Sequence, residues 1–194
     1  MPQLFDYDPP ERFVAGTVGQ PGSRTFFLQA RSGTRITSVA LEKAQVSILA
    51  ERVDELLDEV LRRSGGNAPV PAMAPADAED NAPLEAPIEE EFRVGAMSLA
   101  WAVDAQRVVI ECYSEGLTPE VEEDDDTEGT PPAPAAEDDA EGAILRVSLT
   151  GGLARAFAKR ALAVVAAGRP PCPFCSGPLD AEGHICPRAN GYRR

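Results

Sequence analysis

The clearest periodic pattern in the chain is an apolar stripe at helical spacing over residues 42–63. The opposite face of this segment is charged. Apolar side chains recur at intervals of three and four, at Val46, Leu49, Val53, Leu56 and Val60. Gly65 and Gly66 follow and end the helix. The stripe predicts an amphipathic helix that packs on a sheet. It also fits about two heptads of a coiled coil, so a homodimer through this helix is the alternative.

Period-two patterns on either side of this helix predict strands. Before it, residues 12–19, 24–31 and 34–41 form three strands joined by tight turns, an antiparallel meander. After it, a hairpin and one further strand follow, over residues 91–103, 107–114 and 143–149. The turn-rich first ten residues are expected to be irregular.

A second helix is predicted over residues 151–167, with Thr150 as its N-cap. Its apolar positions face inward, and its basic residues are expected to face outward: Arg155, Lys159 and Arg160. The order of elements predicts an α+β fold. We expect a largely antiparallel sheet of about six strands, two packed helices and a C-terminal zinc knuckle or ribbon-like element.

Negative charge is concentrated in two stretches of the chain. The formal net charge is −14, but residues 77–91 hold seven acidic residues and no basic one, and residues 120–141 hold eleven and no basic one. We therefore expect an α+β domain over residues 1–168 with disordered acidic inserts at about 64–90 and 117–142. The remainder is mildly basic, so the net charge does not by itself indicate a basic partner.

Several functional classes lack their sequence signals. No apolar run approaches the ~18 residues of a membrane span, and the start has no secretory pattern, so we expect a cytoplasmic protein without membrane contact. The chain has no Rossmann glycine motif, Walker motif, nucleophile elbow or kinase motif set. Its one histidine lies near the C-terminus, which excludes a histidine-dependent triad elsewhere. We expect a non-enzymatic protein.

The candidate chemistry lies in a C-terminal element, residues 169–194. Three of the four cysteines and the only histidine fall within fifteen residues there, as C-x2-C followed by H-x-C: Cys172, Cys175, His184 and Cys186. Thiolates and imidazole are ligands of structural Zn²⁺, and four of them complete a tetrahedral shell with no open position. The pattern predicts one structural zinc ion.

Other interpretations of this cluster remain open. They are a redox C-x-x-C pair, a disulfide framework, four unrelated side chains, and a catalytic zinc ion assisted by Asp180 or Glu182. The H-x-C spacing is tighter than that of common zinc ribbons, so a further alternative is that another group replaces His184 or Cys186 as a ligand. The fourth cysteine, Cys112, shares a strand face with Val108 and Ile110 and is interpreted as a core thiol.

The tail after the cysteines is polar and cationic, which is typical of a contact surface. We expect it to bind a protein partner through Arg188, Tyr192, Arg193 and Arg194. The same residues fit nucleic-acid binding, since arginine meets phosphates and tyrosine stacks on bases. A third hypothesis is an enzyme or binder of a phosphorylated small molecule, with a pocket lined by arginines of the strands: Arg12, Arg24, Arg35 and Arg107.

Three segments, residues 13–30, 38–43 and 168–175, together with the ending 180–194, resemble an actinobacterial family known as "domain of unknown function" family 3090. The resemblance covers the chain apart from the two acidic inserts. It implies a cytoplasmic protein without an established activity, and it brings no catalytic residues to this sequence.

Overall fold

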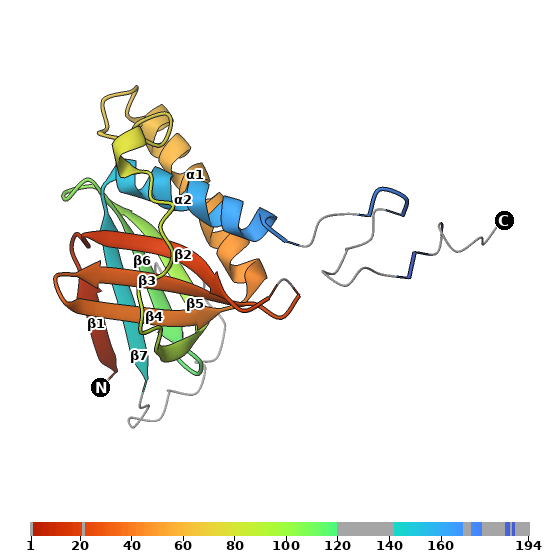
Figure 1. Ribbon diagram of the computed structural model, residues 1–194. Coiled ribbons are helices and arrows are strands. Elements are labelled where there is room, and N and C mark those ends of the chain that lie inside the picture. Colours follow the sequence, from red (N-terminus) through yellow and green to blue (C-terminus); the bar gives the residue numbers. More distant parts are fainter. Residues whose placement is uncertain are drawn as a thin grey trace, which may run out of the picture.

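The computed structural model describes residues 2–20, 22–119, 142–168, 172–175, 185–186 and 188. Seven strands form one sheet in the order β1-β7-β6-β5-β4-β3-β2 (Figure 1). Its pairs are antiparallel except β1 with β7 and β4 with β5. The strands are β1 Gln3–Tyr7, β2 Arg12–Val18, β3 Thr25–Ser32, β4 Arg35–Leu41, β5 Glu90–Ala102, β6 Arg107–Ser114 and β7 Ala143–Leu149. The helices are α1 Lys43–Arg63, the short 3-10 helix η1 Ala76–Ala78, and α2 Gly151–Ala166.

These elements confirm the α+β class with a largely antiparallel sheet and two helices, but the sheet has a strand that was not predicted. β1 was expected to be irregular, and it pairs in parallel with β7. Tyr7 at its end is 1% exposed, and its hydroxyl lies 2.8 Å from Thr37 Oγ1. The Asp and Pro residues among the first ten are typical of turns, so the local sequence does not predict this strand. Its stability comes from a partner 140 residues away.

The sheet is strongly curved. A flat sheet of seven strands would hold its edge strands about 29 Å apart. The edges are β1 and β2, yet residues 8–11, which connect them, span about 18 Å at most. The curvature brings the end of β1 against β4, where Tyr7 meets Thr37. Figure 1 shows α1 and α2 lying together beside this curved sheet.

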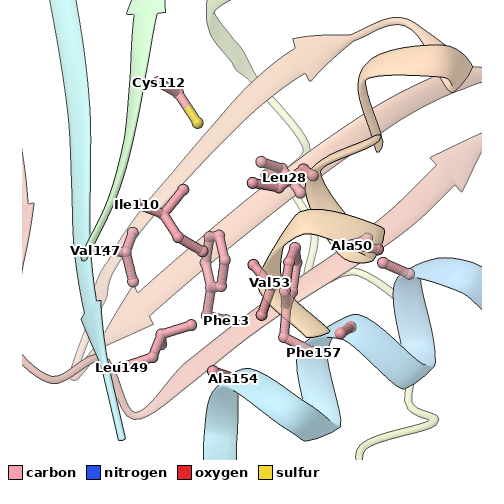
Figure 2. Close-up of a cluster of buried hydrophobic side chains, with 14 of the residues drawn as sticks. Phe13, Leu28, Ala50, Val53, Ile110, Cys112, Val147, Leu149, Ala154 and Phe157 are labelled. Atoms are coloured by element: carbon pink, nitrogen blue, oxygen red, sulfur yellow. The ribbon is translucent and has the colours of Figure 1, made fainter. Parts of the chain in front are cut away.

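The core lies between the helices and the sheet (Figure 2). The ring of Phe157 in α2 stacks on that of Phe13 in β2, with 4.7 Å between centroids. The predicted stripe of α1 faces this core, where Val46, Leu49, Val53 and Leu57 are buried. Cys112 is also buried here, and burial raises its pKa to about 12, so the expected core thiol is confirmed.

The predicted cap of α2 is confirmed, but the expected outward direction of its arginines is wrong. Thr150 Oγ1 accepts a hydrogen bond from the Leu153 N–H at 3.3 Å. Arg155 is only 6% exposed, because α1 packs along α2 and covers it. Its guanidinium donates to Asp54 Oδ1 at 2.9 Å and to Asp58 on α1. Helical periodicity alone did not reveal this second neighbour of α2.

The stretch between α1 and β5 was expected to be a disordered insert, at about 64–90, and it lies against the body of the protein instead. We call residues 71–89 the strap; it is drawn in yellow in Figure 1. Asp80 in the strap accepts hydrogen bonds from Arg12 on β2 at 2.5 Å and from Arg160 on α2 at 3.1 Å. Composition missed this docking because the cationic partners are remote in sequence. The core of the second insert, residues 120–141, lies outside the described residues.

No helix among the described residues is both long enough and apolar enough to cross a lipid bilayer.

Acid should weaken the hold of the strap. The hydrogen bond from Arg12, opposed by burial, lowers the pKa of Asp80 from its usual 3.8. A carboxyl group with a depressed folded-state pKa stabilises the protein above its unfolded pKa and loses that contribution as pH falls through the folded pKa. The difference in unfolding free energy between wild type and Asp80→Asn should therefore be constant above about pH 5 and shrink as pH falls below the usual pKa.

Urea unfolding at a series of pH values, followed by the fluorescence of the single tryptophan, measures this difference. Asp104→Asn is the matched control, because Asp104 lies in an exposed turn and has no hydrogen bond or ion pair within the described ranges. A difference for Asp80→Asn that persists unchanged at pH 3 would contradict the role given to the carboxylate.

Candidate metal centre

Two short limbs near the C-terminus bring three cysteines together. The first limb is a turn over residues 172–175, a few residues beyond α2, in which the Phe174 N–H donates to Cys172 Sγ at 3.5 Å. This hydrogen bond holds the first sulfur over the turn, and the sulfur of Cys175 lies within 4.8 Å of it. The second limb contributes Cys186. The clustering of these three cysteines fits the zinc knuckle that the sequence predicted.

The sulfur positions fit a metal ion better than a disulfide. The three Sγ atoms of Cys172, Cys175 and Cys186 lie within 4.8 Å of one another. Cys172 Sγ and Cys186 Sγ are 3.8 Å apart, whereas a disulfide requires about 2.05 Å. Two thiolates at about 2.3 Å from a tetrahedral zinc ion are separated by about 3.8 Å. These cysteines could therefore hold a metal ion.

The environment of the Cys172 sulfur favours the thiolate, the form that binds metals. Cys172 and Cys186 are buried, and Cys175 is half-buried. Burial alone would raise the pKa of Cys172, but hydrogen bonds from the backbone of Cys175 and Phe174 and from the other two thiols lower it below the ordinary value. A sulfur that is both shielded and biased toward its anion is suited to a closed metal site.

Arg188 links the two limbs. Its Nη1 donates to the carbonyl oxygen of Phe174 at 3.1 Å, and Phe174 lies between the first two cysteines. This predicted partner-binding residue therefore has a structural contact of its own. The side chains of Phe174 and Ile185 are 62% and 84% exposed, which gives the element an apolar outer surface.

The remaining predicted site residues either lie outside the described residues or do not come together. His184, the expected fourth ligand, and the tail residues Tyr192, Arg193 and Arg194 lie outside the described residues. The four arginines proposed for a phosphate pocket do not converge on one site. Each has its own partner elsewhere: Arg12 with Asp80, Arg24 with the Ala167 carbonyl, Arg35 with the Tyr7 ring, and Arg107 with Asp8.

Comparisons with known proteins place the chain in a family but give no activity. A family model described as "Protein of unknown function (DUF3090)" matches residues 5–186, which includes the fold and all three clustered cysteines. No curated protein and no solved structure matched the chain. Because the match spans nearly the whole chain, this protein belongs to the DUF3090 family of proteins of unknown function.

Proposed function

We propose that the C-terminal element binds one structural zinc ion and that the protein is a non-enzymatic binding or adaptor protein, which uses this element and its basic tail to contact a protein partner. The observation that carries the proposal is the arrangement of Cys172, Cys175 and Cys186, with sulfurs within 4.8 Å of one another. His184 would complete the shell. Sulfur-rich sites of this kind select zinc over hard cations such as magnesium.

A structural ion suits this element because its large apolar side chains, among the described residues, are not buried. Phe174 and Ile185 both point largely into solvent. Metal–ligand bonds replace a hydrophobic core in elements of this size, so metal binding and folding of the element are one process. By holding the element folded, the ion would keep the apolar side chains and the cationic tail on one defined surface. A protein partner could bind such a surface.

Elemental analysis of protein purified without added zinc tests the metal site. We expect about one zinc ion per chain in the wild type and less than about a tenth of that in Cys175→Ala, since removing one thiolate opens the shell. Cys112→Ala is the matched control: it removes a buried thiol of the core and should keep its zinc. His184→Ala should lose the metal as well, which tests the fourth ligand.

Wild-type protein without metal would refute the proposed site, and so would equal metal loss in Cys112→Ala. The adaptor role is tested separately by removing residues 189–194, which keeps Arg188 and its contact with Phe174. Partners that the wild type captures should be lost while zinc is retained. If the truncated protein captured the same partners as the wild type, the tail would not be part of the interface.

A further inference from the structure

The strap lies in a groove that is built from three elements. Its floor is the outer face of β2 and β3, and its wall is α2. Along a strand, alternate side chains point to opposite faces. Phe13 and Ala15 of β2 join the core, so the side chain of Arg12 points outward into the groove, and Gly16 leaves space on the same face. By the same alternation, Gln29 of β3 lies on this outer face, since Leu28 belongs to the core.

The groove holds the main chain of the strap. Arg12 Nη2 donates to the carbonyl oxygens of Ala82 at 3.0 Å and Pro83 at 2.9 Å, and Arg160 Nη2 donates to Ala82 O at 2.7 Å. The side-chain amide of Gln29 exchanges two hydrogen bonds with the backbone of Glu85, at 3.0 and 2.8 Å. Contacts of this kind accept an extended peptide without selecting its side chains.

Three positions of the strap are held through their side chains. The carboxylate of Asp80 is shared by Arg12 and Arg160. Leu84 packs where β2 has a glycine, since a Cβ built on Gly16 would lie 2.6 Å from Leu84 Cγ. Glu85 lies 2.9 Å from Arg31 Nε. The groove thus selects the pattern Asp-x-x-x-Leu-Glu in an extended chain.

The arginines make this groove unfavourable without an acidic occupant. The side chains of Arg12 and Arg160 are only 10% and 11% exposed. Burial and the nearby charge of Arg12 lower the pKa of Arg160, and the charge of Asp80 opposes them. If Asp80 left, two adjacent buried cations would lose the carboxylate they share, which is costly. An acidic occupant is therefore favoured over a neutral or basic one, because it balances two adjacent cations.

The strap itself is held more loosely than the elements around it. None of residues 71–89, all of which the structure describes, is buried. A cavity of about 460 Å³ remains between strap residues 77–82 and the α2 side chains Leu153 and Phe157. Segments with few buried apolar contacts open at low free-energy cost compared with global unfolding. The strands and helix that form the groove can therefore stay folded when the strap leaves it.

We propose that this groove is a docking site for an acidic, extended peptide of the pattern Asp-x-x-x-Leu-Glu, and that the strap is the occupant it carries in its own chain. A partner peptide competes with the strap, whose tether gives it a high effective concentration. The wild type then binds such a peptide weakly, and any change that loosens the strap strengthens binding. This inference goes beyond the metal site and does not depend on it.

The test uses a dye-labelled peptide with the sequence of residues 78–87, read by fluorescence anisotropy against the full-length protein. The variant Asp80→Ala/Leu84→Ala weakens the strap while leaving the groove residues Arg12, Gly16, Gln29 and Arg160 intact. We expect it to bind the peptide at least about tenfold more tightly than the wild type does, because the competitor has been weakened. A peptide carrying Asp80→Asn should bind about tenfold more weakly than the native peptide, since a charge-assisted hydrogen bond is lost.

A peptide of scrambled sequence is the control, and binding of the native peptide should weaken with added salt. If the folded variant binds native and scrambled peptides equally, the groove is not a peptide site. If the variant fails to fold, as measured by circular dichroism, the strap is a permanent part of the structure and the proposal is also wrong. Repeating the titration with a metal chelator should leave the affinity unchanged, which separates this result from the fate of the zinc proposal.

Discussion

Truncation of Phe157 to alanine should lower the free energy of unfolding by about 3–5 kcal/mol. The side chain is 2% exposed and stacks on Phe13, so the variant loses both buried area and an aromatic pair. It also lines the cavity beside the strap, so the deletion enlarges an existing space instead of letting neighbours close over it. Small domains have about 5–15 kcal/mol of stability in total, so the loss is a large fraction of it.

Urea unfolding followed by Trp101 fluorescence measures the change, because Trp101 is the only tryptophan and packs against the same core. Phe174→Ala is the matched control: the same substitution at a side chain that is 62% exposed should change the unfolding free energy by less than about 0.5 kcal/mol. Similar effects at the two positions would mean that α2 does not anchor the sheet as described.

Local pattern predicted the parts of the fold whose burial follows a simple period. The stripe of α1 and the core position of Cys112 are examples, and the structure confirms both of them, as it confirms the local cap signal at Thr150. In these cases one face of the element meets the core and the other meets water, so the sequence records the difference directly.

Features that depend on remote partners were missed for the same physical reason. β1 is stabilised by β7, and the strap by arginines on β2 and α2, so neither shows a periodic signal of its own. The acidity of the strap looked like disorder because charge repulsion is the default for an acidic stretch. The one available hint was the balance of charge: a mildly basic body offers partners to an acidic segment.

The clustering of three cysteines was predictable to the extent that they are close in sequence. Cys172 and Cys175 lie in one turn, and the structure brings Cys186 to them, as the spacing indicated. The link from Arg188 to Phe174 could not be predicted, because it joins the two limbs through a backbone carbonyl. The groove that holds the strap could not be predicted either, because its residues come from β2, β3 and α2.

Replacing Arg155 by methionine should also be strongly destabilising, by about 1–3 kcal/mol. Its guanidinium donates to the Asp54 carboxylate and to the carbonyl oxygens of Asp54 and Pro71, at distances of 2.9, 3.3 and 3.2 Å. Loss of a partner from a fully buried ion pair costs about 3–5 kcal/mol. The effect here should be smaller, because the side chains of Asp54 and Asp58 are 37% and 71% exposed and water can solvate them.

Arg52→Met is the matched control on α1, since Arg52 forms an ion pair with Glu55 at 2.9 Å while its side chain is 70% exposed. Such a surface pair contributes about 0–1 kcal/mol and is screened by salt. The loss at Arg155 should persist at 1 M salt, because that guanidinium is shielded from solvent. If high salt removed the difference between Arg155→Met and wild type, the contact would be an ordinary surface pair, and α1 and α2 would be held together by their apolar faces alone.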